Sequence, residues 1–135
     1  MSELRLKPRW WRLNMDQNSI VLEVENEVSG KKLQKMVITR HFQQAHDSPG
    51  PVAQAKYIFE TLQNHPNLNL QGRNEILSAT AGLPRELKGW HEDYRKTVVD
   101  IEADTETVIM ITQYPLSKSE YGQERRAAEV LRLTL

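Results

Sequence analysis

The histidines and paired carboxylates of this sequence are the side chains best suited to metal binding or to acid–base catalysis. His41 and His46 are five residues apart, which would place them about 140° apart on a helix, so they are poorly spaced to share a metal ion. His65 directly precedes a proline at an expected helix end, where a histidine usually caps carbonyl groups. A solvated strand edge accounts for Asp100 and Glu102. No glycine-rich phosphate loop, His-Glu-x-x-His helix or Gly-x-Ser-x-Gly elbow is present, so we predict neither a metal nor a cofactor.

A second group of residues is suited to binding. Arg9 and Arg12 flank Trp10 and Trp11, and cations beside aromatic rings are typical of surfaces that stack on single-stranded bases. Adjacent residues of a strand point to opposite faces, so at most one of the two tryptophans can lie in a core. Together with Arg40, these four residues are our candidates for a binding surface, which would take either a protein partner or RNA.

Composition indicates a single folded domain spanning residues 1–135. The chain has 39% hydrophobic and 27% charged residues, which is in the globular range, and its length suffices to bury a core without disulfides or metal. The absence of cysteine excludes disulfide scaffolds, zinc ribbons and thiol chemistry. No apolar run is long enough to cross a bilayer, and the N-terminus lacks the apolar core of a signal peptide. We therefore expect a soluble cytoplasmic protein with no membrane partner.

The 18 basic and 18 acidic residues cancel overall but are distributed in blocks of alternating sign. Residues 1–15 and 31–41 are net positive, whereas residues 16–30 and 92–106 are net negative. On successive strands such blocks would pair across a solvated sheet face, each pair contributing under about 1 kcal/mol. The alternative is that the two basic blocks merge into a surface that binds polyanions, although zero net charge predicts no long-range attraction to nucleic acid.

Hydrophobic periodicity predicts strands at both ends of the chain and helices between them. Residues 9–15, 20–25 and 33–38 fit three antiparallel strands, the last two joined by a tight turn at Ser29 and Gly30. The other expected elements follow in order: a helical turn at 40–46 capped by Thr39, helices at 52–64, 74–80 and 84–88, and strands at 94–102, 107–114 and 126–135.

This order predicts an α+β fold: an antiparallel β-sheet with an N-terminal three-stranded meander, two or three central helices packed on one face, and C-terminal strands. The strand at 107–114 is the most β-prone and least charged segment, so we expect it to be central in the sheet.

Three stretches carry a resemblance to a known superfamily. They are Ile-Thr-Arg-His-Phe at 38–42, Tyr-Arg-Lys-Thr-Val-Val-Asp at 94–100 and Thr-Glu-Thr-Val-Ile-Met-Ile-Thr-Gln-Tyr-Pro at 105–115. Over residues 36–116 the chain resembles the small metal-independent ribonucleases of the barnase, EndoU, colicin and RelE type, which share the BECR fold. Members of that superfamily place helices before an antiparallel sheet. Many enter the first helix through a Thr-x-His or Arg-His pair and end paired strands in a Val-Ile-Thr-x-Tyr-Pro-like segment.

The resemblance implies cleavage of RNA without a metal, which needs an acid, a base and a cation beside the phosphate. It implies that His41 is the base or the acid, since the pKa of histidine is near neutrality. Arg40 or Arg95 would bind the phosphate, because arginine stays charged and binds oxygens in pairs. Thr112 and Tyr114 would donate hydroxyl hydrogen bonds. Each residue also has a structural interpretation: a half-buried histidine bonded to its own turn, a cross-strand ion pair, or a tyrosine packed on the next proline.

Two functions from different classes stay open, and the sequence does not decide whether the chain is an enzyme. The first is a small non-catalytic interaction module of the immunity, antitoxin or adaptor type, which binds a partner protein through a mixed-charge sheet face. The alternative is a metal-independent ribonuclease or ribonuclease-like toxin domain that uses His41 with Arg40 or Arg95. The balanced charge favours the first function, because RNA-cleaving domains of this size are often basic. Either function is compatible with a homo-oligomer formed through a C-terminal strand at 127–135.

Overall fold

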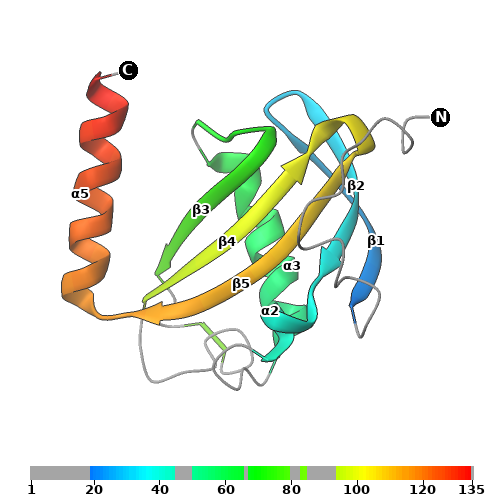
Figure 1. Ribbon diagram of the computed structural model, residues 1–135, viewed down its shortest axis with the longest axis horizontal. Coiled ribbons are helices and arrows are strands. Elements are labelled where there is room, and N and C mark those ends of the chain that lie inside the picture. The colour runs from blue at the N-terminus through cyan, green and yellow to red at the C-terminus, as the bar shows by residue number, and fades with distance from the viewer. Residues whose placement is uncertain (1–18, 45–49, 66, 80–82, 85–93, 135) are drawn as a thin grey trace.

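The computed structural model shows an α+β fold built on a five-stranded mixed sheet (Figure 1). It describes residues 19–44, 50–65, 67–79, 83–84 and 94–134, with 129–134 as backbone alone. The strands are β1 (Ile20–Val28), β2 (Lys31–Ile38), β3 (Gln71–Ala79), β4 (Tyr94–Glu102) and β5 (Thr107–Leu116). The helices are α2 (Arg40–Gln44), α3 (Pro51–Thr61) and α5 (Lys118–Thr134), with short 3-10 turns η3 (Leu62–Asn64) and η4 (Ala103–Thr105). The predicted α+β class is confirmed.

The strand order β1-β2-β5-β4-β3 joins two antiparallel groups of strands at the middle of the sheet. β2 pairs with β5 in parallel, with Val37 opposite Ile109, whereas the other neighbouring pairs are antiparallel. The chain leaves the sheet at the end of β2, crosses one face through α2 and α3, and returns as β3 at the far edge (Figure 1). β5 is therefore the central strand, as its low charge predicts.

The β1–β2 hairpin closes through a two-residue turn. Ser29 and Gly30 both have positive φ, 51° and 81°, which is the backbone of a type I′ turn and confirms the predicted reversal. Across the hairpin the acidic block lies beside the basic block, and Lys32 Nζ is 3.2 Å from Glu25 Oε1. The predicted pairing of charge blocks across a sheet is confirmed for this pair.

α2 and α3 pack on one face of the sheet and enclose the main core (Figure 1). Periodicity predicts a helix at 52–64, and α3 spans Pro51–Thr61 with η3 completing its last turn. A proline fits its first turn, where the missing N–H has no partner to lose. The buried residues of this core come from all five strands, from both helices and from η3: Val28, Leu33, Met36, Ile38, Phe42, Ala55, Ile58, Phe59, Leu62, Ile76, Val99, Ile101, Val108 and Met110.

The helix predicted at 74–80 is wrong, because these residues belong mostly to β3. Burial alternates along this strand, with Gly72, Asn74 and Ile76 buried and the residues between them exposed. The apolar residues near position 76 fit a helical period as well as a strand period. Antiparallel pairing with β4 along the whole of β3 stabilises the strand rather than the helix.

The strand predicted at 126–135 is also wrong, because residues 126–134 continue α5. A capping box starts the helix: the Glu120 N–H donates to Ser117 Oγ (3.1 Å), and the Ser117 N–H donates to Glu120 Oε1 (2.8 Å). Since residues 127–134 are helical, the C-terminal strand suggested for a homo-oligomer is not formed. None of the helices in the described ranges, α5 included, has the length and apolar character needed to cross a membrane.

Some predictions fall outside the described residues. They are the strand at 9–15, with the binding candidates Arg9, Trp10, Trp11 and Arg12, and the helix at 84–88 beyond its first residue. The predicted three-stranded meander is therefore described only in its second and third strands, β1 and β2.

Candidate functional site

The junction between β2 and α2 is fastened to the end of the central strand. The Thr39 N–H donates to the Met110 carbonyl oxygen (3.2 Å), and the Thr39 hydroxyl donates to the Ile111 carbonyl oxygen (2.9 Å). The same hydroxyl accepts the Phe42 N–H (3.1 Å), so Thr39 caps the helical turn as predicted. Phe42 is fully buried and anchors this turn in the core. The junction and the end of β5 therefore meet, although 72 residues separate Thr39 from Ile111.

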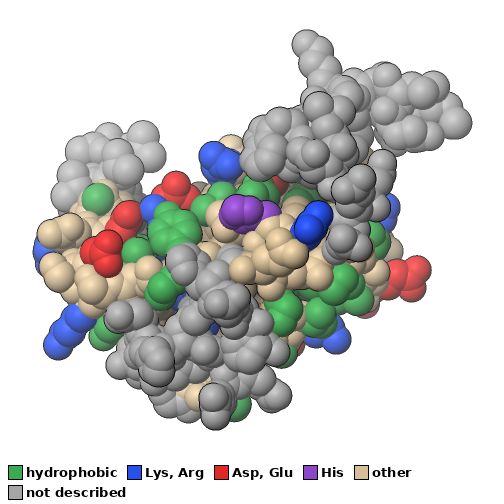
Figure 2. All heavy atoms as spheres, turned by 60° about the horizontal axis from the view of Figure 1, so that its bottom comes forward, with side chains coloured by type: hydrophobic (Ala, Val, Ile, Leu, Met, Phe, Trp, Pro, Cys, Tyr) green, Lys and Arg blue, Asp and Glu red, His purple; other side chains and the backbone are tan. Residues whose placement is uncertain are grey.

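Arg40 and His41 lie on this junction, and both side chains are exposed. Figure 2 turns this end of the molecule toward the viewer and shows basic, acidic and hydrophobic side chains close together on it. The imidazole of His41 is thus accessible from solvent, as an acid or base must be, rather than half-buried in its own turn.

Arg95, by contrast, lies inside the protein. Its partner in the β4–β5 register is Pro115, and by strand alternation it lies on the same face as Thr97 and its partner Gln113, the face that α3 covers. Only 1% of Arg95 is exposed. Burial lowers the pKa of the guanidinium to about 10, a shift that Tyr57 partly opposes, so the group is cationic at neutral pH.

Other buried polar side chains lie on the same face of the sheet. Gln113 Nε2 on β5 donates to Gln54 Oε1 on α3 (2.8 Å), and both glutamines are fully buried. Thr97, opposite Gln113 across the β4–β5 pair, is also buried. Because a buried amide is costly without a hydrogen-bond partner, this bond favours one position of α3 on β5. The hydrogen bond between Gln54 and Gln113 was not predicted from the sequence. The signal that could have indicated it is the presence of polar residues at alternate positions of otherwise buried strands.

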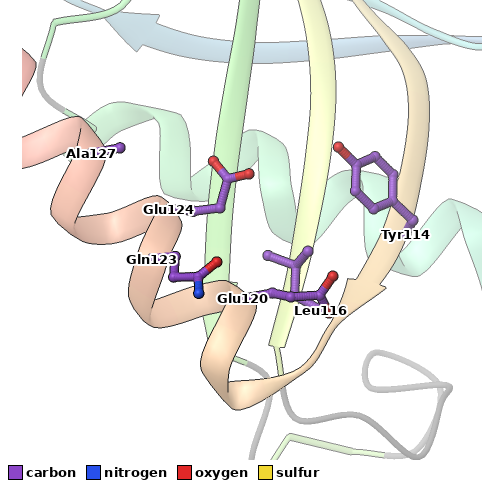
Figure 3. Close-up of a pocket in the computed structure, with 6 residues that line it drawn as sticks. All are labelled: Tyr114, Leu116, Glu120, Gln123, Glu124 and Ala127. Carbon is purple, nitrogen blue, oxygen red and sulfur yellow. The ribbon is translucent and has the colours of Figure 1, made fainter.

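Thr112 and Tyr114 are directed to the opposite face from Gln113, because successive side chains of a strand alternate. Thr112 lies opposite Val98, which belongs to a second apolar cluster that Tyr114 also contacts. Tyr114 and Leu116 line a groove beside α5 (Figure 3).

The four residues predicted for catalysis therefore occupy three places. Arg95 is on the face covered by α3, Thr112 and Tyr114 are on the face toward α5, and His41 is at the end of the sheet. A rotamer change cannot carry a side chain through the sheet, so Arg95 and the two hydroxyls do not share a face. The catalytic roles of these residues stay predictions.

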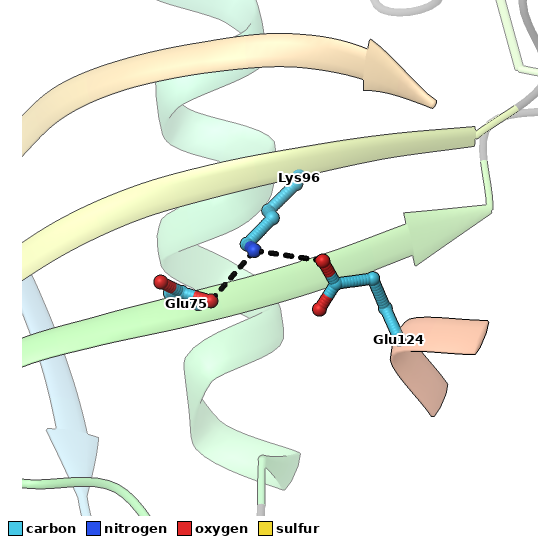
Figure 4. Close-up of polar contacts among 3 residues, drawn as sticks. All are labelled: Glu75, Lys96 and Glu124. Carbon is cyan, nitrogen blue, oxygen red and sulfur yellow. Dashed lines mark hydrogen bonds and ion pairs between the residues drawn. The ribbon is translucent and has the colours of Figure 1, made fainter. Parts of the chain in front are cut away.

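Lys96, the neighbour of Arg95, is a cation beside Tyr114 on this face, and sequence reasoning missed it. Lys96 Nζ lies 2.7 Å from Glu75 Oε1 on β3 and 3.1 Å from Glu124 Oε1 on α5 (Figure 4). It is also 5.9 Å from the centre of the Tyr114 ring. The Lys96 side chain is only 9% exposed, whereas those of Glu75 and Glu124 are 54% and 41% exposed. Lys96 thus links three elements, β3, β4 and α5.

Burial alone would lower the pKa of Lys96, but hydrogen bonds to Glu75 and Glu124 outweigh it and raise the pKa above its ordinary value. The ammonium is therefore charged at neutral pH. Tyr94 and Tyr121 add a second contact between β4 and α5, since their rings stack with centroids 4.3 Å apart. A charged contact and an aromatic contact thus join the described part of α5 to the sheet.

A second surface with an ordered charge pattern lies at the outer edge of the sheet. Three exposed glutamates occupy alternate positions of the edge strand β1: Glu23, Glu25 and Glu27, here named the acidic stripe. The neighbouring strand β2 carries exposed lysines, of which Lys35 and Lys32 lie opposite Glu23 and Glu27. The hairpin thus presents both signs of charge side by side, with a register shift between Glu23 and Asn26.

Across the described ranges, no group of three or more His, Cys, Asp or Glu side chains is placed to hold a metal ion. No protein-family model matches the chain, and no curated protein or solved structure matches it either. A function must therefore rest on the geometry of these surfaces.

We predict that Lys96→Met, which keeps the length of the side chain but removes its charge, lowers the free energy of unfolding by about 1 kcal/mol at pH 7. Because folding raises the pKa of Lys96, its contribution is complete below the ordinary lysine pKa of about 10.4 and is lost as the pH rises through the raised value. Urea unfolding at several pH values measures the difference between wild type and variant.

The matched control is Lys56→Met, at an exposed position of α3, which should change stability little at any pH. A Lys96→Met difference that is as large near pH about 12 as at neutral pH would contradict the ion-pair role, because only packing of the stem would then account for it.

Proposed function

We propose that this chain is a non-catalytic interaction module that binds a partner protein through the mixed-charge face of the β1–β2 hairpin. The observation that carries the proposal is the acidic stripe, in which Glu23, Glu25 and Glu27 alternate along an exposed edge strand beside the lysines of β2. Because exposure alternates along β1, the stripe presents its carboxylates to one side of the sheet, and the register with β2 shifts by one residue between Glu23 and Asn26.

The charges of this face contribute little to folding. An exposed ion pair such as Lys32–Glu25 stabilises a protein by under about 1 kcal/mol, because water competes for both groups and both side chains lose freedom. In an interface, the same charges attract a complementary partner and reject a wrong one. A chain with zero net charge depends on such local patterns to steer association.

The acidic stripe also favours a different protein over a second copy of this chain. Antiparallel pairing of two β1 edges would bring the glutamates of one copy beside those of the other, and like charges directly opposite on a sheet are destabilising. Charged residues on an edge strand are one way in which proteins prevent self-association. We therefore infer a partner that presents basic side chains toward β1 and acidic side chains toward β2.

We predict that the variant Glu23→Gln/Glu25→Gln/Glu27→Gln captures the partner about tenfold less well than wild type at low salt. Three charge contacts are lost, and about 0.5 kcal/mol for each suffices for that factor. Immobilised protein incubated with a cell extract, followed by quantitative mass spectrometry, measures the capture. The variant should fold normally, because the stripe is exposed.

A matched control adds the same three units of positive charge at exposed positions elsewhere, through Gln63→Lys, Asn64→Lys and Gln71→Lys. This control should leave capture unchanged. If wild type and the stripe variant capture the same proteins equally, or if the control reduces capture as much as the stripe variant does, the hairpin is not the binding face.

One observation favours the ribonuclease as a second candidate. The Thr39 hydroxyl donates to the Ile111 carbonyl oxygen, so the turn that carries the exposed His41 lies at the end of β5, beside the residue that precedes Thr112. α2 and α3 also precede the antiparallel strands β3 to β5, an order that the superfamily resemblance implies. We rank this candidate second because Arg95 faces α3 and not the groove side of the sheet.

If the chain cleaves RNA, we predict that His41→Ala slows cleavage by about 10²- to 10⁴-fold, which is the usual contribution of a general acid or base. The control His65→Ala should leave the rate unchanged. Incubation of purified protein with total RNA in EDTA, with fragments separated on a gel, gives the rates. This candidate is lost if no cleavage occurs or if His41→Ala cleaves as fast as wild type.

A further inference from the structure

A groove of about 420 Å³ separates β5 from the first half of α5 (Figure 3). Its walls are formed by Tyr114 and Leu116 on the strand and by Glu120, Gln123, Glu124 and Ala127 on the helix. Tyr114 extends from β5 and both glutamates extend from α5 toward the same space (Figure 3). The volume lies within the range of ligand-binding pockets and is ample for one long side chain.

The groove carries an excess of negative charge. Hydrogen bonding with Ser117 lowers the pKa of Glu120, chiefly through the bond that the Ser117 backbone N–H donates to the Glu120 carboxylate. Glu120 is therefore ionised at neutral pH. Glu124 shares the ammonium of Lys96 with Glu75. The groove is lined by two carboxylates, Glu120 and Glu124, and the one ammonium beside it is already shared with Glu75, so the lining carries at least one negative charge in excess.

Lys96 is itself a cation held beside this groove by two of its lining residues, Glu124 and Tyr114. Its ammonium contacts the carboxylates of Glu75 and Glu124 and lies 5.9 Å from the centre of the Tyr114 ring. Carboxylates beside an aromatic ring are the groups that recognise a cation in proteins. Glu120, one turn earlier on α5 than Glu124, has no ion pair with any of the described cations, so the groove can accept a second cation.

We propose that the β5–α5 groove binds an arginine side chain of a partner protein, with its guanidinium at Glu120 and its stem against Leu116 and Ala127. The apolar stem of arginine fits these walls, and its planar head binds carboxylates in pairs and stacks on tyrosine. RNA and other phosphates carry the same sign of charge as the groove and are repelled. The groove is separate from the acidic stripe, so this inference goes beyond the proposed function.

The test uses the peptide acetyl-Gly-Arg-Gly-amide and the same peptide with citrulline, which keeps the shape of arginine but removes its charge. The two peptides are titrated into the full-length chain and followed by ¹⁵N–¹H NMR. We expect the arginine peptide to shift the amide resonances around the groove, on β5 and on residues 120–127 of α5. The citrulline peptide should bind at least about fivefold more weakly.

Single substitutions separate the groove from other acidic surfaces. Glu120→Gln should weaken the arginine peptide about fivefold, and its amide oxygen can still accept the Ser117 N–H at the start of α5. Gln123→Glu should strengthen binding, because it adds a carboxylate to the wall. Glu60→Gln, exposed on α3, and the acidic-stripe variant should change nothing. A failure in this test therefore leaves the proposed function standing.

Three results overturn the inference. The first is no resonance shift at any soluble concentration of the arginine peptide. The second is equal binding of the arginine and citrulline peptides, or shifts spread over acidic residues outside the groove. The third is tighter binding of spermidine than of the peptide in a manner that depends on Glu120, which would assign the groove to a free polyamine.

Discussion

β2 and β5 run parallel through the middle of the sheet, and their pairing joins the N-terminal hairpin to the three later strands. A parallel pair cannot be closed by a tight turn, and here the connection crosses one face of the sheet through α2 and α3 and reaches β5 only after β3 and β4. Thr39 ends the pairing through two hydrogen bonds to β5 and caps α2 with the same hydroxyl. Because these bonds share one residue, the end of β2, the start of the helical layer and the location of His41 are fixed together.

Strand alternation then distributes the polar residues between two environments. Arg95 and Gln113 face α3, where they are buried and Gln113 is bonded to Gln54. Lys96 and Tyr114 face α5, where the lysine holds the helix and the tyrosine lines the groove. Arg95 and Lys96 are neighbours on β4, but the guanidinium of Arg95 is buried on the α3 side of the sheet, whereas the ammonium of Lys96 forms ion pairs on the α5 side. The two proposed binding surfaces lie at opposite margins of the sheet, the hairpin at one edge and α5 at the other (Figure 1).

Features that depend on neighbouring residues could be predicted from the sequence. The turn at 29–30, α3 and the strands β4 and β5 follow from short-range spacing alone. The conformations of the segments at 74–80 and 126–135 could not be predicted, because their apolar residues fit both a helical and a strand period. Pairing with β4 makes the first segment a strand. The second is helical because it continues a helix that begins at Lys118. Within the site, the junction that carries the exposed histidine could be recognised. The choice between Arg95 and Lys96 could not, since it depends on which side of β4 the helix α3 covers.

The parallel pairing of β2 with β5 can be tested directly, because the chain contains no cysteine. Lys35 lies opposite Thr107 in the register, so Lys35→Cys/Thr107→Cys should oxidise to an intramolecular disulfide, which requires Cα atoms about 4.4–6.8 Å apart. The pair Lys35→Cys/Thr112→Cys should stay reduced, because Thr112 lies beyond the paired segment. Non-reducing electrophoresis and mass spectrometry should find the first cross-link and not the second. The opposite result would mean a reversed or shifted pairing and would contradict this architecture.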